Sequence, residues 1–203
     1  MKKPQQLQLM KKDLRFFGGA LLKSKRKNLR PLSSKDPIHI VMRSTFAKGK
    51  DSFLAQRNLS AIERFISIFS KRFHIRVYQH AIVGNHIHLI IRSPHRNQHK
   101  AFIKALSGKI ASHVMGDQSF DVFWRSRRGD GVQQTKQGLQ DQEKPQGFWE
   151  FRPFTRVMYW GRDFKKCCEY LKQNTLEAIG FVAYKPRKNY YARWLKETVP
   201  ILI

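Results

Sequence analysis

Apolar and polar residues alternate in several short stretches of the chain, with the period of two that a β-strand produces. The first stretch, PIHIVMR at 37–43, is also rich in β-branched residues. Further strands are expected at 74–83, 86–92 and 148–160. The pair Gly84-Asn85 is a tight-turn signal between the second and third strands. Pro153 interrupts the fourth and favours a place for it at an edge of the sheet.

Three other stretches carry apolar residues at the spacing of an amphipathic helix. They run over about 52–73, 97–114 and 163–179. Asp51 or Ser52 is the expected cap of the first, and Asp163 of the third. The resulting order, βαββαβ and then a helix, predicts an α+β fold of the ferredoxin-like type, an antiparallel sheet with two packed helices. The additional C-terminal helix must then pack against the other face or an edge.

Composition divides the chain into three parts. Residues 1–36 are basic and punctuated by glycines, which indicates an arm that is at most partly ordered. Residues 37–180 form the expected domain, and the Gly-, Gln- and Arg-rich stretch 117–147 within it is expected to be a long mobile insert. Residues 181–203 form a basic and aromatic tail.

Charge is the strongest feature of the composition. The 203 residues include 40 Lys and Arg against 14 Asp and Glu, a net charge of +26. Nucleic acid is the commonest partner of such a protein, and an anionic membrane surface is the rival. No apolar run approaches the roughly 18 residues of a spanning helix, and the N-terminus lacks the apolar stretch of a secretory signal. The adjacent Cys167 and Cys168 are expected to be reduced packing residues of a cytoplasmic protein.

The stretch GNHIHLII at 84–91 places two histidines one residue apart inside an apolar run. On a strand, His86 and His88 share one face, and the intervening aliphatic residues share the other. The pair is either a site for a divalent metal or a polar face that meets solvent.

The last predicted helix carries its apolar residues four or three positions apart. This seam consists of Phe164, Cys168, Leu171, Thr175 and Ala178. Tyr170 lies roughly 120° from the middle of the seam, and Asn174 roughly 80° on the same side. Two imidazoles and an amide oxygen would suit Mg²⁺ or Mn²⁺, with Tyr170 as a nucleophile towards a phosphate on that ion. The alternative is a tyrosine at the rim of the helix that only covers apolar surface.

The NHIHLII strand followed much later by the CCEYLKQN helix resembles the HUH single-tyrosine transposases. These include the insertion-sequence transposases and the REP-associated tyrosine transposases. The segments RPLSSKDPIHIVMRS and FWEFRPFTRVMYWGRDF add to the resemblance, which covers about residues 17–180. Val83-Gly84 stands where relatives usually have Met-Pro, and Lys172-Gln173 also departs from the usual tyrosine motif.

The resemblance implies a metal-dependent DNA strand transferase. His86, His88 and Asn174 would hold Mg²⁺ or Mn²⁺, and Tyr170 would cut single-stranded DNA, often beside a hairpin. The products would be a 5′-phosphotyrosine link and a free 3′-hydroxyl, from which a second strand can be joined in DNA transposition. The chain would act as a monomer or homodimer, with Tyr170 serving the histidines of its own chain or of a partner.

Other residues keep more than one interpretation. His39 is expected to be a structural strand histidine, and His80 is left unassigned. Candidate DNA contacts from the insert and tail are Arg125, Arg127, Arg128, Arg187, Lys188 and Arg193. These residues suit contacts to single-stranded DNA. Alternatively, they belong to a basic loop and to a helix docked on the domain, and have no part in DNA binding.

Two rival functions share this fold and charge. One is a non-catalytic or domesticated nucleic-acid-binding protein, although GNHIHLII lacks the exposed aromatics of RNA-recognition strands. The other is a replication or conjugation nuclease of the HUH type. Many of these carry a helicase domain, and this chain has no phosphate-binding Gly-Lys loop.

Overall fold

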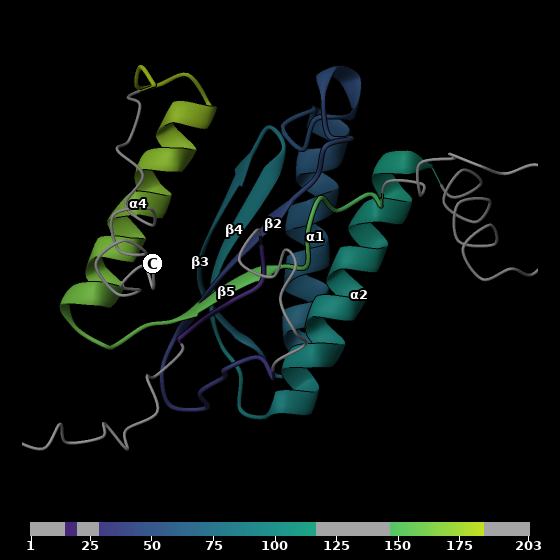
Figure 1. Ribbon diagram of the computed structural model, residues 1–203. Coiled ribbons are helices and arrows are strands. Elements are labelled where there is room, and N and C mark those ends of the chain that lie inside the picture. Colours follow the sequence, from purple (N-terminus) through teal and green to yellow (C-terminus); the bar gives the residue numbers. More distant parts are fainter. Residues whose placement is uncertain (1–14, 20–28, 117–146, 185–203) are drawn as a thin grey trace, which may run out of the picture.

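A computed structural model describes residues 15–19, 29–116 and 147–184 of the chain (Figure 1). Its strands are β1 (Phe16–Phe17), β2 (Ile38–Arg43), β3 (Arg76–Val83), β4 (His86–Arg92) and β5 (Phe154–Val157). Its α-helices are α1 (Gln56–Arg72), α2 (Arg96–Met115) and α4 (Arg162–Ala178). The strands form one five-stranded sheet in the order β1-β5-β2-β4-β3, and every neighbouring pair is antiparallel.

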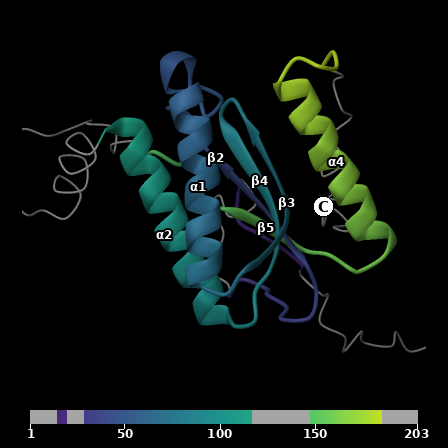
Figure 2. The ribbon, with the colours of Figure 1, turned by 180° about the vertical axis from the view of Figure 1, so that it is seen from behind.

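The predicted fold class is confirmed. From β2 to β5 the elements follow the order β-α-β-β-α-β, and β2 and β4 occupy the middle of the sheet. Helices α1 and α2 lie side by side on one face, and α4 is the helix that the described residues place on the other (Figures 1 and 2). The sheet therefore separates two layers, and the histidine strand runs through its interior.

Alternation along the two middle strands assigns one face of the sheet to the main core. Ile87, Leu89 and Ile91 of β4 are completely buried, as are Ile38 and Ile40 of β2. They pack with apolar residues of α1 and α2, among them Ile62, Ile66, Phe102, Leu106 and Ile110. A second, smaller cluster lies under α4 and consists of Ala81, Ile90, Met158, Cys167 and Leu171. The intervening residues of β2 and β4, including the histidines, are thereby turned towards α4.

Two expectations about β5 and α1 were wrong. β5 does not lie at an edge, because Phe16 and Phe17 pair with Arg156 and Thr155 along its outer side. Helix α1 begins at Gln56 after a 3-10 turn at Gly49–Asp51, so neither Asp51 nor Ser52 caps it. The Ser52 hydroxyl instead donates to the carbonyl oxygen of Gly84, in the turn that joins β3 to β4.

The expected cap of α4 was also misplaced. Gly161 is the N-cap of this helix, and Asp163 lies within the first turn. There the Asp163 carboxylate pairs with Arg156 of β5 and accepts a hydrogen bond from the backbone N–H of Tyr159. It thus joins the start of α4 to the sheet instead of capping the helix.

Parts of the expected arm, insert and tail fall outside the described residues. The arm is described at 15–19 and 29–36, and Arg30 within it donates to the Pro153 carbonyl and to Thr155 Oγ1. Residues 117–146 of the insert and 185–203 of the tail are not described.

Candidate active site

His86 and His88 stand on the face of β4 that α4 covers. Their cross-strand partners on β2 are Arg43 and Val41, whereas Ile87 between them pairs with Met42 on the core face. The two imidazole rings approach edge to face, with centroids 4.8 Å apart. His88 is 3% exposed and His86 is partly exposed. The strand therefore presents two neighbouring imidazoles to one space, one deep and one towards solvent.

A third histidine joins them from β2. His39 is completely buried, and its Nε2 lies 3.2 Å from Nδ1 of His88. The two rings stack, with centroids 5.4 Å apart and planes 11° from parallel. His39 was expected to be a structural strand histidine, and the structure adds its contact with His88. The alternation in PIHIVMR puts His39 opposite Ile38 and Ile40, but its place beside His88 depends on the register between β2 and β4.

Two of the three rings, those of His39 and His86, lie in surroundings that disfavour a positive charge. Burial, and then the charge of Arg156, lowers the pKa of His39 to about 3. Burial, and then the charge of Arg43, lowers the pKa of His86 to about 4. At neutral pH His39 and His86 are therefore uncharged, and the uncharged ring is the form that binds metals.

Helix α4 brings Tyr170 over these rings. The Tyr170 ring meets His88 edge to face, with centroids 5.6 Å apart, and lies 6.4 Å from the ring of His39. Tyr170 is partly buried at the rim of the smaller core cluster and is not sealed inside it. The structure thus places together the tyrosine and the histidines that the sequence singled out.

The buried face of α4 is turned by one residue from the expected seam. The buried residues are Cys167, Leu171 and Asn174, where Cys168, Leu171 and Thr175 were expected. Asn174, at 7% exposure, therefore belongs to the covered side of the helix, and Tyr170 lies roughly 65° from the middle of that side. One side of α4 carries both residues, one turn apart, as a shared site requires.

Three contacts hold α4 in this orientation. Asp163 in its first turn pairs with Arg156 of β5. Gln79 of β3 donates from Nε2 to the carbonyl oxygen of Cys168, at 3.1 Å. Phe164 packs edge to face on Tyr78 of β3, with ring centroids 5.4 Å apart. Since these contacts lie on the turns that precede and flank Tyr170, they fix the angle at which its ring meets the sheet.

The chemistry of the donor atoms fits a divalent metal. Nδ1 of His86 lies 2.8 Å from Oδ1 of Asn85, an atom that can only accept, so His86 carries its proton on Nδ1 and its lone pair on Nε2. Nδ1 of His88 is likewise engaged, by His39. A ligating histidine usually has its second nitrogen held in this way. Among the described residues no cluster of three or more His, Cys, Asp or Glu side chains is arranged for a metal, so an amide such as Asn174 would have to complete the protein's ligands.

The remaining predicted residues do not gather here. His80 is exposed and pairs with Leu89, so it belongs to the opposite side of β3 from Ala81, the partner of His88. The six candidate DNA contacts lie outside the described residues: Arg125, Arg127, Arg128, Arg187, Lys188 and Arg193. Among the residues that are described, no helix is both long and apolar enough to cross a membrane.

Comparison with known proteins connects the histidine strand to one family. The model of the IS200-like transposases matches residues 34–126, a segment that includes His86 and His88 and ends before α4. No curated protein matches the chain.

Two solved structures are similar to this chain. One is a REP-associated tyrosine transposase bound to a REP hairpin, with 11% identity, 87% of this chain and 89% of that chain covered, and a TM-score of 0.48. The other is a protein of Deinococcus radiodurans described as a transposase, with 11% identity, 73% and 98% covered, and a TM-score of 0.38. The sequence match shows that residues 34–126 of this chain, with the paired histidines, are similar to the IS200-like transposases.

Proposed function

We propose that this protein cuts and rejoins single-stranded DNA through a covalent link to Tyr170. The observation that carries the proposal is the edge-to-face approach of the Tyr170 ring to His88, at 5.6 Å between centroids. Among the described residues, buried His39 and His88 lie beneath α4, and the Tyr170 ring meets both. This contact joins a part of the chain that matches the transposase family to a helix that lies outside the match.

The residues around Tyr170 have separate tasks in this proposal. His86, His88 and Asn174 would hold Mg²⁺ or Mn²⁺, which when bound supplies a positive charge beside the phosphate under attack. Asn85 and His39 position the two ligating rings through their Nδ1 atoms. Arg43 and Arg156 lie close enough to lower the pKa values of His86 and His39, and their charges favour the approach of a DNA phosphate.

The reaction itself is a phosphoryl exchange that needs no external energy source. The Tyr170 oxygen forms a bond to phosphorus and loses its proton, while the bond from phosphorus to the 3′ oxygen breaks and that oxygen gains a proton. The phosphodiester becomes a phosphotyrosine ester on the 5′ end of the strand downstream of the cut, and the upstream strand keeps a free 3′-hydroxyl. A second 3′-hydroxyl can then attack the same phosphorus and release Tyr170, which joins two DNA ends.

The DNA partner follows from the family and the charge. A transposase acts on DNA, and a net charge of +26 supplies the attraction to its backbone. We propose a single-stranded substrate with a hairpin beside the cut, as the resemblance to HUH transposases implies. The predicted basic arm and tail would add backbone contacts at the two ends of the domain.

The proposal is tested by incubating the full-length protein with Mn²⁺ and labelled single-stranded DNA that carries hairpins. A protein band that keeps the label on a denaturing gel is the expected result. The same band from a Tyr170→Phe protein would overturn the assignment of the nucleophile.

A further inference from the structure

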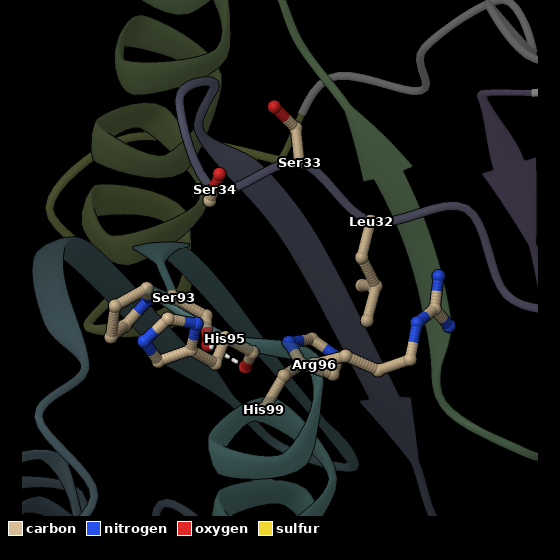
Figure 3. A pocket seen from close by; sticks show the side chains of 8 residues that line it. Leu32, Ser33, Ser34, Ser93, His95, Arg96 and His99 are labelled. Carbon is tan, nitrogen blue, oxygen red and sulfur yellow. Dashed lines mark hydrogen bonds between the residues drawn. The ribbon is translucent and has the colours of Figure 1, made fainter.

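A second polar site lies at the other end of the histidine strand. An open pocket of about 220 Å³ lies between residues 32–34, which precede β2, and residues 93–96 and His99, where β4 ends and α2 begins (Figure 3). From His88 to Ser93 the chain advances roughly 17 Å as extended strand. The pocket is therefore separate from the candidate active site.

His99 is the feature of this pocket that calls for a ligand. The residue is 2% exposed, lines the pocket, and has no hydrogen-bond partner for Nδ1 or for Nε2 within the described part of the chain. Buried polar atoms are nearly always hydrogen-bonded, because an unmade bond costs free energy. A histidine with both ring nitrogens in this condition, against a pocket with room for several waters, indicates that a molecule binds there.

The start of α2 adds donors that suit an anion. The N-cap residue, His95, makes no side-chain hydrogen bond to the first turn, and that turn contains no acidic residue. The amide N–H groups at a helix start favour negative charge when no side chain covers them. The helix has 20 residues, so its dipole is fully developed.

The charges around His99 have the same sign. Burial, followed by the charges of Arg30 and Arg96, lowers the pKa of His99 to about 4. Arg96 lines the pocket, and one of its N–H groups donates to the carbonyl oxygen of Arg30 at 2.9 Å. That contact holds the Arg96 side chain in place while its other donors remain for a ligand. Asp36, which follows the lining residues 32–34 in the chain, accepts from the hydroxyl of Ser33 and does not line the pocket.

We propose that this pocket binds a phosphate group of a DNA strand, with His99, the first-turn amides of α2 and Arg96 as its donors. That the phosphate belongs to DNA rests on the proposed function. That the pocket binds a phosphate group does not. Such a contact would hold the DNA at one end of the sheet while Tyr170 acts near the other. It would orient the strand without reading its sequence.

The test uses the full-length protein, with inorganic phosphate and a single-stranded oligonucleotide as probes. His99→Leu removes two buried unpartnered nitrogens, so this variant should be at least as stable as the wild type without ligand. It should nevertheless bind phosphate at least tenfold more weakly. Arg96→Gln should also weaken phosphate binding, whereas Lys104→Gln, with the same loss of charge at an exposed site on α2, should not. Equal phosphate affinity in the wild type and His99→Leu would overturn the site.

The oligonucleotide identifies the source of the phosphate. Phosphate should compete with the oligonucleotide, and Arg96→Gln should lower the salt dependence of DNA binding by about one phosphate contact. If phosphate binds but neither variant changes DNA affinity, the DNA assignment is wrong. Failure of the proposed function is seen separately, because the covalent adduct depends on Tyr170 and phosphate binding depends on His99.

Discussion

Nε2 of His39 lies 3.2 Å from Nδ1 of His88, between adjacent strands in the buried middle of the sheet. If His88 binds a metal through Nε2, its Nδ1 carries the proton and donates to His39. His39 can accept because its surroundings keep it uncharged, with its pKa lowered to about 3 mainly by burial. In that case a histidine would take the place of the carbonyl or carboxylate that usually orients a ligating imidazole.

Replacing His39 by Ala should weaken metal binding without removing a ligand. We expect Mn²⁺ affinity, measured by calorimetry, to fall by about 10- to 100-fold, because His88 loses the partner that fixes its tautomer and orientation. His39→Gln, whose amide oxygen can accept a hydrogen bond, should recover part of the loss. His80→Ala removes an exposed histidine and serves as the control. Unchanged affinity in His39→Ala would show that His39 only fills space.

Asn174 should respond to charge as a metal ligand does. Asn174→Ala should weaken Mn²⁺ binding by about tenfold, because one of the protein's ligands is lost. Asn174→Asp should strengthen Mn²⁺ binding, because it adds a carboxylate. The neighbouring amide Gln173, which donates to Glu177 Oε1, provides a matched control as Gln173→Ala. If Asn174→Asp and Asn174→Ala bind Mn²⁺ equally, Asn174 is a packing residue.

The buried His99 should make the protein less stable in acid. Its pKa is lowered to about 4 from 6.5, so between these values the unfolded chain binds a proton that the folded chain excludes. Stability contributed by the uncharged ring is present above pH 6.5 and is lost as the pH falls towards 4. Between pH 7 and pH 5 the wild type should lose on the order of 2 kcal/mol more than His99→Leu in urea unfolding. Identical profiles for His99→Leu and wild type would contradict this account.

Asp163 should stabilise the orientation of α4. Its carboxylate pairs with Arg156, and the two side chains are 28% and 19% exposed. Asp163→Asn should lower the free energy of unfolding by about 1–2 kcal/mol, through the weakened ion pair and the loss of negative charge in the first turn. Glu169→Gln, at an exposed position of the same helix, is the control. Equal loss in both variants would mean that the Arg156 pair contributes nothing.

Much of the fold could be predicted from the local sequence pattern. The third strand was expected at 86–92 and is found at His86–Arg92, because an aliphatic alternation bounded by Gly84-Asn85 and Pro94 leaves little freedom. The same alternation placed His86 and His88 on one face. Helix α2 begins and ends one residue beyond its expected bounds.

The features that the sequence analysis missed all depend on contacts between residues that are far apart in the sequence. Phe16 and Phe17 form β1 only because β5 offers an unpaired edge far along the chain, and no local pattern announces that pairing. The rotation of α4 could not be read from its apolar residues, because Cys167 and Cys168 are adjacent and chemically alike. His39 approaches His88 through the register between β2 and β4, which single-strand periodicity does not give.

The central claim, that Tyr170 forms the covalent bond to DNA, is tested most directly by identifying the modified residue. The full-length protein would be incubated with Mn²⁺ and a hairpin-bearing single strand, digested with nuclease and protease, and analysed by mass spectrometry. We predict a nucleotide attached to the peptide that contains Tyr170, lost in Tyr170→Phe and kept in Tyr159→Phe, a variant of an exposed tyrosine just before α4. A nucleotide attached to any other residue, or an adduct that persists in Tyr170→Phe, would contradict the account.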